Sequence, residues 1–197
     1  MDRIRVLYLT NNNNALVLYE WLKDKCEITL CEARLDLSYI ENVKPDLIIS
    51  YNYKYLIREE VINYMGGNTI NLHISYLPWN RGSSPNFWSF YDDTPKGVTI
   101  HQISAGLDEG KILYQRECRF NPYEETFATS YEKLNNTIVE LFKENWEEIK
   151  AGTYRLKSQE GSGSYHTMKD FNELIEKHPF KWTDNIGEYL DKVKPQK

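Results

Sequence analysis

The sequence lacks a long apolar run. Although 41% of its 197 residues are hydrophobic, no stretch approaches the roughly 20 residues that a membrane-spanning helix needs. The first apolar run, residues 4–9, turns polar at Thr10 before it is long enough for the core of a secretory signal. We therefore expect a cytoplasmic protein that has no membrane partner.

Positive charge and cysteine are also scarce. The sequence has 24 Lys and Arg residues and 29 Asp and Glu residues, so its formal net charge is −5. Such a field repels nucleic-acid backbones, and nucleic acid is not an expected partner. Cys26, Cys31 and Cys118 are odd in number and contain no Cys-x-x-Cys pair. They are expected to be reduced and structural, and no metal site is predicted.

No covalent nucleophile stands in a recognisable setting. The sequence has no Gly-x-Ser-x-Gly elbow. The tract at residues 161–164 lacks the Gly-Lys-Ser/Thr ending of a phosphate loop, and we interpret it as a hinge or loop. Any group transfer is therefore expected to pass directly to an external amine or to water.

Apolar runs alternate with helical patterns along the chain. Strands and helices follow each other up to residue 73, and two later strands enclose a glycine-containing turn. This order predicts one α/β domain, a Rossmann-like, open, mostly parallel sheet flanked by helices, with a β-hairpin extension. The expected strands are 4–9, 27–31, 45–50, 69–73, 97–103 and 111–117. The expected helices are 15–22, 37–43, 58–64, 85–91, 126–150 and 169–177.

Two segments are distinguished within that single domain. Residues 1–155 are expected to form its core, because they hold all the predicted strands and the long helix. Residues 156–197 are expected to complete the same domain as a loop, a short helix and a tail that frays from Lys192.

The candidate site lies in the strand at 69–73 and in the turn of the hairpin. Asn71 and His73 flank Leu72, so both project to the same face of the strand. A His, with an unperturbed pKa of about 6.5, can take a proton from an attacking amine. An Asn amide can donate to an oxyanion. Asp108, in the turn, can fix the tautomer of the His and favour its charged form. The three predict an acyl-transfer site.

Each of these residues also has a structural interpretation. His73 alone is equally well explained as a hydrogen-bonded structural histidine, Asn71 as a strand-end hydrogen-bonding residue, and Asp108 as a turn residue. Of the other histidines, His101 and His178 are interpreted as structural or exposed. His166 is intermediate between a structural and a functional residue.

The same stretch resembles a known family. Its spaced motifs are Asn71-Leu72-His73, Leu77-Pro78, Arg81-Gly82, Gly97-Val98-Thr99-Ile100-His101 and Gly106-Leu107-Asp108-x-Gly110. This string is similar to the catalytic core of the 10-formyltetrahydrofolate-dependent formyltransferases, densely over residues 45–118 and more loosely before them. The segments at 78–90, 93–99 and 163–166 look most like the sugar N-formyltransferases that act on nucleotide-linked amino sugars.

The resemblance implies the formyltransferase fold and a role for each site residue. His73 would be the general base toward the sugar amine, Asn71 would stabilise the tetrahedral oxyanion, and Asp108 would set the charge of the His and assist proton movement. Folate would be held largely by backbone groups, at Ser50, Tyr51, Tyr53, Ser104 and Leu107. The residues implied for the sugar nucleotide are Asn11, Asn12, Trp79, Arg81, Asn86, Tyr165 and His166. No metal is implied.

The implied function is transfer of a formyl group from 10-formyltetrahydrofolate, as co-substrate, to a nucleotide-linked amino-deoxysugar. We expect dTDP as the nucleotide and lipopolysaccharide O-antigen biosynthesis as the setting. Relatives that act on tRNA carry a further C-terminal domain and a basic surface, and relatives that act on glycinamide ribonucleotide have a phosphate loop where this chain has residues 11–14. Both departures favour the amino-sugar interpretation.

Three alternatives remain open. They are hydrolysis of formyltetrahydrofolate by the same triad, formylation of another small amine, and a non-catalytic module that binds folate or a nucleotide. The oligomeric state is open between a monomer and a homodimer, because related sugar enzymes dimerise through added C-terminal elements.

Overall fold

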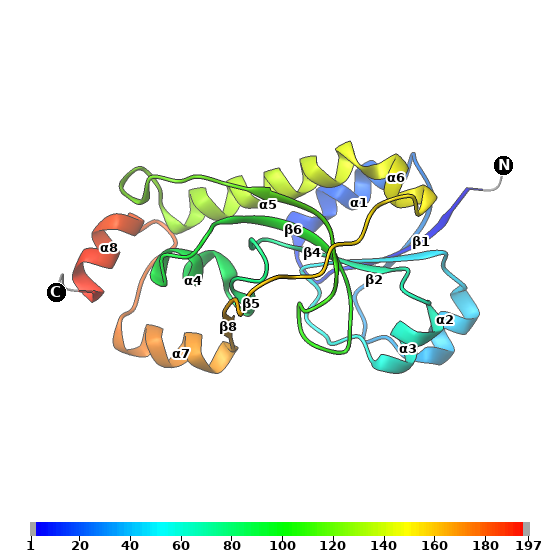
Figure 1. Cartoon of the computed structure of the whole chain (residues 1–197), viewed down its shortest axis with the longest axis horizontal. Coiled ribbons are helices and arrows are strands. Elements are labelled where there is room, and N and C mark those ends of the chain that lie inside the picture. The colour runs from blue at the N-terminus through cyan, green and yellow to red at the C-terminus, as the bar shows by residue number, and fades with distance from the viewer. Residues whose placement is uncertain (1–2, 195–197) are drawn as a thin grey trace. The chain divides into compact units, whose positions relative to one another are not determined.

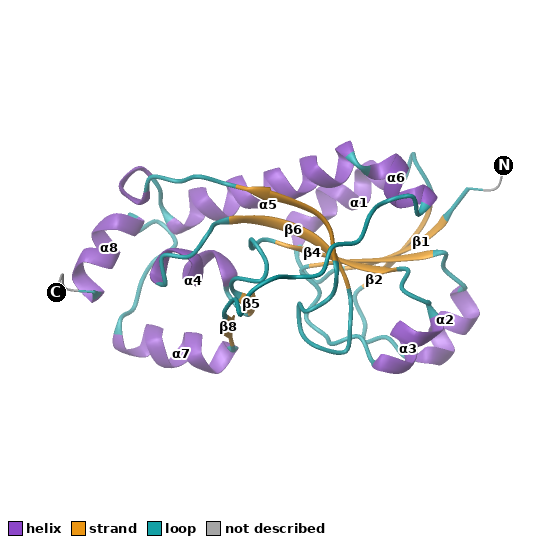
Figure 2. Ribbon diagram, in the orientation of Figure 1, coloured by secondary structure: helices purple, strands orange, loops and turns teal. Residues whose placement is uncertain are grey.

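The computed structural model describes residues 3–194, and strands and helices alternate through their first half (Figures 1 and 2). The strands of the main sheet lie in the order β2-β1-β3-β4-β6-β7, and the pairs β1–β2, β1–β3 and β3–β4 are parallel. This arrangement confirms the predicted Rossmann-like sheet, with β6 and β7 as neighbours joined by the glycine turn. The strands are β1 (Arg5–Leu9), β2 (Glu27–Cys31), β3 (Leu47–Tyr51), β4 (Thr69–His73), β6 (Gly97–Gln102) and β7 (Ile112–Glu117).

The helices agree with the prediction except in two places. They are α1 (Leu16–Leu22), α2 (Leu37–Val43), α3 (Glu59–Tyr64), α4 (Pro85–Tyr91), α5 (Phe127–Glu144), α6 (Trp146–Ala151), α7 (Met168–Lys177) and α8 (Ile186–Val193). The single helix expected over 126–150 is divided, because Asn145 has φ −106° and ψ 9° and leaves the helical conformation. Helix α8 was not predicted, and residues 195–197 of the expected tail lie outside the described residues.

The chain forms two compact units that interleave along the sequence. The first unit comprises residues up to 73, 100–114 and 142–158, and the second comprises residues 74–99, 115–141 and from 159 onward. Strands β6 and β7 and helix α5 each run from one unit into the other. The predicted division at residues 155 and 156 stays a prediction. None of the helices within residues 3–194 is long and apolar enough to cross a membrane.

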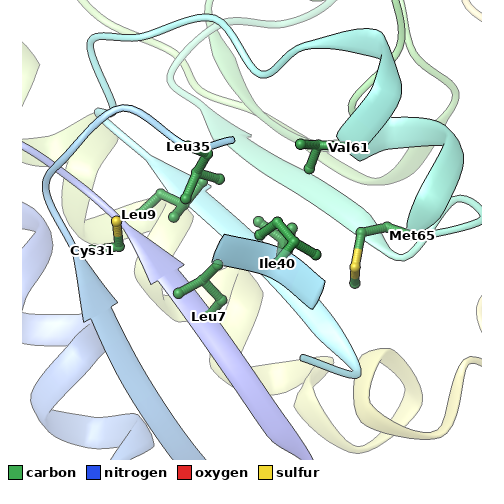
Figure 3. Packing of buried hydrophobic residues seen from close by; sticks show 8 residues of the cluster. Leu7, Leu9, Cys31, Leu35, Ile40, Val61 and Met65 are labelled. Carbon is green, nitrogen blue, oxygen red and sulfur yellow. The ribbon is translucent and has the colours of Figure 1, made fainter. Parts of the chain in front are cut away.

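Helices α2 and α3 cover one face of the sheet in the first unit. Because side chains alternate along a strand, Leu7 and Leu9 point to this face. Tyr8 points to the other, where its hydroxyl donates to Ala15 O at 2.7 Å. Fully burying a Leu or Ile side chain stabilises the fold by roughly 1.5–3 kcal/mol. The cluster, shown in Figure 3, comprises Leu7, Leu9, Cys31, Leu35, Ile40, Ile48, Val61 and Met65.

An aromatic cluster forms the core of the second unit, where side chains of α4, α5 and α8 meet. The ring of Phe87 stacks on that of Phe127, with centroids 5.5 Å apart and planes 22° apart. Such pairs contribute roughly 0.5–1.5 kcal/mol beyond the effect of area burial. The buried members are Phe87, Trp88, Phe90, Phe127, Ile186 and Tyr189.

The C-terminal ends of the parallel strands form one edge of the sheet in the first unit. Ser50 at the end of β3 is in register with Leu9 of β1 on one side and with Asn71 of β4 on the other. Open α/β sheets bind their ligands at this edge. Asn71 and His73 therefore lie where the fold places functional groups.

Candidate active site

The three side chains predicted to act together lie close to one another in the first unit. Asn71 Nδ2 donates to Asp108 Oδ1 across 3.4 Å, and His73 Nδ1 lies 3.8 Å from Asp108 Oδ2. The side chains of His73 and Asp108 are each only 9% exposed. The catalytic roles assigned to them stay predictions, but their proximity is a feature of the structure.

Two local features bring Asp108 to the end of β4. Asp108 adopts a left-handed conformation with φ 54°, which Asp tolerates better than most residues. A Cβ atom on Gly110 would lie 1.7 Å from Gln102 O, so only glycine lets the turn close this tightly against β6. The turn between β6 and β7 therefore directs the carboxylate toward Asn71 and His73.

A fourth side chain, His101 of β6, belongs to the same cluster. Its Nε2 lies 3.3 Å from Asn71 Nδ2 and 3.4 Å from Asp108 Oδ1, and the side chain is 2% exposed. The rings of His101 and His73 meet edge to face, with centroids 6.2 Å apart. Sequence reasoning interpreted His101 as structural or exposed. The pairing of β4 with β6 brings it to the site, and no local pattern in the sequence reports that pairing.

The hydrogen bonds of His101 determine which way the Asn71 amide points. His101 Nδ1 lies 2.7 Å from Gln102 O, and a carbonyl oxygen only accepts, so Nδ1 carries a proton. In the neutral ring, Nε2 then accepts one hydrogen of Asn71 Nδ2. The second amide hydrogen faces Asp108 Oδ1 across a long 3.4 Å contact. The N–H that makes this long contact would donate to the oxyanion instead if Asn71 has the predicted role.

The contact between His73 and Asp108 suits a base. At 3.8 Å the two atoms are beyond hydrogen-bond range. When His73 gains a proton, attraction to the carboxylate strengthens, because opposite charges favour the charged form of each partner. Because Nδ1 faces Asp108, Nε2 is the nitrogen that would take the proton if His73 acts as the predicted base.

Three of the residues predicted to bind folate follow or end β3. Ser50 is 7% exposed and Tyr51 is fully buried, so the Tyr51 side chain serves packing. The Tyr53 hydroxyl donates to Ala33 O at 2.5 Å and accepts from Leu35 N at 3.2 Å. The Tyr53 side chain thus holds a neighbouring loop.

The other two residues predicted to bind folate lie between β6 and β7. Ser104 Oγ donates to Gly106 O at 3.1 Å and shapes the turn. Leu107, next to Asp108, is 40% exposed. At Ser104, as at Tyr53, the side chain holds the backbone in place, which is compatible with recognition through main-chain groups. Folate binding at all five positions stays a prediction.

Asn11 and Asn12, predicted to bind the sugar nucleotide, hold the backbone beyond β1. Asn11 Nδ2 donates to Glu32 O at 2.8 Å, and Asn11 Oδ1 accepts from Lys54 N at 3.1 Å. This one side chain ties together the chain segments that follow β1, β2 and β3. Asn12 Oδ1 accepts from Asn14 N at 2.9 Å and caps the short 3-10 helix Asn13–Ala15.

The remaining predicted sugar-binding residues belong to the second unit. Strand β5 (Arg81–Gly82) pairs in parallel with β8 (Tyr165–His166), and Trp79 lies two positions before β5. Asn86 lies outside this pair of strands, in α4. It is 5% exposed, and its Nδ2 donates to Phe127 O at 3.2 Å. Its side chain thus ties α4 to α5, while a role in sugar binding stays a prediction.

The cysteines are unpaired, and two of them are poorly suited to catalysis. All three thiols are free. Burial raises the pKa of the Cys26 thiol to about 11 and raises that of Cys118 as well, so both are protonated near neutral pH. Within residues 3–194, no group of His, Cys, Asp or Glu side chains is arranged to hold a metal ion.

Comparison with known proteins places this site in a family context. Residues 32–144 match the family described as formyl transferase. The dTDP-4-amino-4,6-dideoxyglucose formyltransferase of Mycobacterium bovis is 34% identical over 129 residues, which cover 66% of this chain and 54% of that protein. The methionyl-tRNA formyltransferase of Syntrophus aciditrophicus is 30% identical over 161 residues, which cover 80% and 50% of the two chains. The chain thus spans about half the length of these curated relatives.

Solved structures also match over nearly the whole chain. The formyltransferase PseJ from Anoxybacillus kamchatkensis, in complex with UDP-4,6-dideoxy-4-formamido-L-AltNAc and tetrahydrofolate, superposes with a TM-score of 0.86 at 37% sequence identity. The match covers 96% of this chain and 100% of that one. The fold is therefore that of the formyltransferases, as the sequence motifs predict.

Proposed function

Because the chain belongs to the formyl transferase family, we propose that it transfers a formyl group from 10-formyltetrahydrofolate to the amine of a nucleotide-linked amino-deoxysugar. The observation that carries the proposal is the cluster of Asn71, His73 and Asp108 at the C-terminal edge of the parallel sheet. A relative named for an amino-sugar substrate and a similar structure solved with a formamido-sugar nucleotide support the choice of acceptor.

The proposed reaction needs one base and one oxyanion donor. The amine nitrogen attacks the formyl carbon, the electrons of the carbonyl bond move onto oxygen, and Asn71 Nδ2 donates to that oxygen. His73 takes the proton that the amine loses, and the Asp108 carboxylate stabilises the resulting imidazolium. The bond from the formyl carbon to N10 of the folate then breaks. N10 takes the proton that His73 holds, which returns the His73 ring to its neutral form, and the products are a formamide and tetrahydrofolate.

We propose dTDP as the nucleotide. The relative from Mycobacterium bovis is named for a dTDP sugar, whereas PseJ was solved with a UDP sugar, so a test must include both nucleotides. No transition metal enters the proposed chemistry, because the triad supplies the base and the oxyanion donor.

The proposal is tested by incubating the purified protein with 10-formyltetrahydrofolate and a panel of dTDP- and UDP-linked 3-amino and 4-amino deoxysugars. Mass spectrometry is expected to detect the formamide of a dTDP-linked sugar, with an equal amount of tetrahydrofolate released. Formate release at the same rate without any sugar would identify a hydrolase instead. Tight folate binding without turnover across the panel would identify a binding module.

A further inference from the structure

Two segments far apart in the sequence hold each other in the second unit. We name residues 163–166 the clasp and residues 78–84 the Arg81 loop. Asn80 of the loop and Ser164 of the clasp are 84 positions apart in the sequence, yet strands β5 and β8 within these segments lie side by side (Figure 1). The sequence predicts a hinge or loop at residues 161–164. The structure has a loop there, and several contacts tie the start of the clasp to the Arg81 loop.

The main chains of the two segments are joined by three hydrogen bonds. Arg81 N donates to Ser164 O at 3.0 Å, Ser83 N donates to His166 O at 2.8 Å, and Ser164 N donates to Pro78 O at 3.2 Å. These bonds fix the loop at both of its ends and in its middle. They do not depend on the side chains of the residues that make them.

The Ser164 side chain adds two contacts to the loop at one residue. Ser164 Oγ accepts from Asn80 N at 2.8 Å and donates to Asn80 Oδ1 at 3.2 Å. Asn80 itself is fully buried. A hydroxyl that satisfies both the main chain and the side chain of a buried residue fixes that residue's conformation.

Two glycines allow the close approach. A Cβ atom on Gly163 would lie 2.0 Å from Pro78 O, and one on Gly82 would lie 2.3 Å from His166 O. In both cases the obstacle is main chain, so no change of side-chain rotamer relieves it. Gly163 and Gly82 also have φ of +62° and +87°, a region that L-residues rarely adopt.

The Arg81 loop adopts a conformation that needs external support. Two of its non-glycine residues, Asn80 and Ser84, have positive φ, at 56° and 53°. Such conformations persist only where surrounding structure enforces them. The clasp supplies that structure at Asn80 directly and at Ser83, the neighbour of Ser84.

The His166 side chain is engaged within the protein. Its ring stacks on that of Trp88 in α4, with centroids 3.9 Å apart and planes 4° apart. Its Nε2 lies 2.8 Å from Asp92 Oδ2, an ion-pair distance when the ring is charged. These contacts anchor the clasp to α4 and to the residue that follows it.

We propose that the clasp holds the Arg81 loop in the conformation that binds the sugar nucleotide, and that Ser164 and His166 are positioning residues for substrate binding. The proposal rests on the proposed function, because the loop carries Trp79 and Arg81, both predicted to bind that substrate. Arg81 is held in turn by Gln159, whose Oε1 accepts from Nε at 3.1 Å and from Nη2 at 2.8 Å. The clasp thus fixes the backbone of Arg81, and Gln159, which precedes the clasp in the sequence, fixes its guanidinium.

The substitution Gly163→Ala tests the clasp, with Gly161→Ala as its matched control. Both glycines have positive φ, at +62° and +84°, but a Cβ atom on Gly161 would have nothing within 4 Å. The control therefore carries the backbone strain without the collision. Ser164→Ala is the second test variant, since it keeps both glycines and removes only the contacts to Asn80.

Calorimetry with the amino-sugar nucleotide that the wild-type protein formylates is the main measurement. In Gly163→Ala and Ser164→Ala we expect the dissociation constant to rise by about tenfold or more, as when a binding conformation is occupied for roughly one tenth of the time. Tetrahydrofolate affinity and kcat are expected to stay within about twofold, because loss of uniform binding raises KM alone. Amide hydrogen exchange is expected to accelerate at Arg81 and Ser83 in Gly163→Ala, and at Asn80, whose N loses its acceptor, in Ser164→Ala. Gly161→Ala is expected to change neither.

Three outcomes would decide against parts of this account. If the sugar-nucleotide affinity is the same in Gly161→Ala and in both test variants, the clasp proposal is wrong and the proposed function still stands. Equal losses of folate and sugar affinity would show a general structural defect and would also overturn it. If the wild-type protein binds and formylates no sugar nucleotide, the proposed function fails, and the clasp proposal fails with it.

Discussion

At the scale of single residues, the proposed chemistry depends on one base and one oxyanion donor, so the loss of either side chain should be measurable. Removing the proposed base or the proposed oxyanion donor, by His73→Ala or Asn71→Ala, is expected to lower turnover of the proposed amino-sugar substrate roughly 100-fold or more. Steady-state kinetics checks this. His178→Ala is the control, because His178 forms its hydrogen bonds to Leu174 and Tyr189 through its main-chain N and O. Full turnover in either site variant would show that the assigned roles are wrong.

His101 is expected to act through the Asn71 amide. His101→Phe keeps a ring but removes the acceptor at Nε2 that faces Asn71 Nδ2 at 3.3 Å. We expect turnover to fall about tenfold, the effect of one hydrogen bond of roughly 1.4 kcal/mol. His101→Gln offers a carbonyl oxygen near the same position and is expected to recover part of the loss.

The order of the two His101 variants separates positioning from packing. If His101 only fills space, the Phe variant, with its ring retained, will turn over faster than the Gln variant. Folate affinity, measured alongside, is expected to be the same in both. A difference in folate affinity would place His101 at the folate site rather than behind Asn71.

Part of the candidate site is predictable from local patterns and part is not. The period of two residues along β4 places Asn71 and His73 on one face of the strand. The approach of Asp108 depends on a turn that closes because Gly110 lets its backbone reach Gln102 O. The inclusion of His101 depends on which strand lies beside β4. The positions of Asp108 and His101 depend on contacts between residues far apart in the sequence, which no local periodicity encodes.

At the scale of elements, the local sequence pattern was too short or too weak to predict strands β5 and β8 and helix α8. The ladder of β5 and β8 has two residues in each strand, too few to show any alternation. Helix α8 carries Ile186, Tyr189 and Leu190 at helical spacing. The pattern is hidden by the short length of the helix and by its charged residues, Glu188, Asp191 and Lys192. In contrast, β3, which is buried on both faces, is apolar except for Ser50, and its bounds were predicted to within two residues.

The segments that follow three neighbouring strands are held together by Asn11. Asn11→Ala removes the donor to Glu32 O and the acceptor of Lys54 N. We expect the free energy of unfolding to fall by about 1–3 kcal/mol, because both main-chain groups lose their partner. Urea denaturation measures the change. Asn14→Ala, at an exposed position whose main-chain N donates to Asn12, is expected to have an effect within roughly 0.5 kcal/mol.

The same pair of variants tests the alternative role of Asn11. If Asn11 serves only as a substrate ligand, Asn11→Ala will leave the urea midpoint unchanged and weaken binding of the sugar nucleotide. If it serves as a tie between strand ends, stability will fall whether or not binding changes. The two measurements on one variant therefore distinguish a structural Asn from a ligand.

At the scale of the whole molecule, the two units share the property that each buries tyrosine hydroxyls. Burial raises the pKa of Tyr53 in the first unit to about 12 and that of Tyr189 in the second to about 12. In an unfolded chain the pKa of a tyrosine is about 10. The folded protein thus keeps both phenols protonated where the unfolded chain begins to ionise them.

This difference fixes the sign of the alkaline pH dependence. Above pH 10 the unfolded state releases these protons first, so the stabilisation by the raised pKa values is complete below pH 10 and is lost as pH rises from about 10 to about 12. Urea unfolding at pH 8, 10 and 11.5 is expected to show a falling free energy above pH 10. Tyr53→Phe lowers stability at every pH by removing the bonds to Ala33 and Leu35. Because the variant also removes one titrating group, its loss of stability above pH 10 is expected to be shallower, and a slope equal to that of the wild type would show that Tyr53 does not contribute.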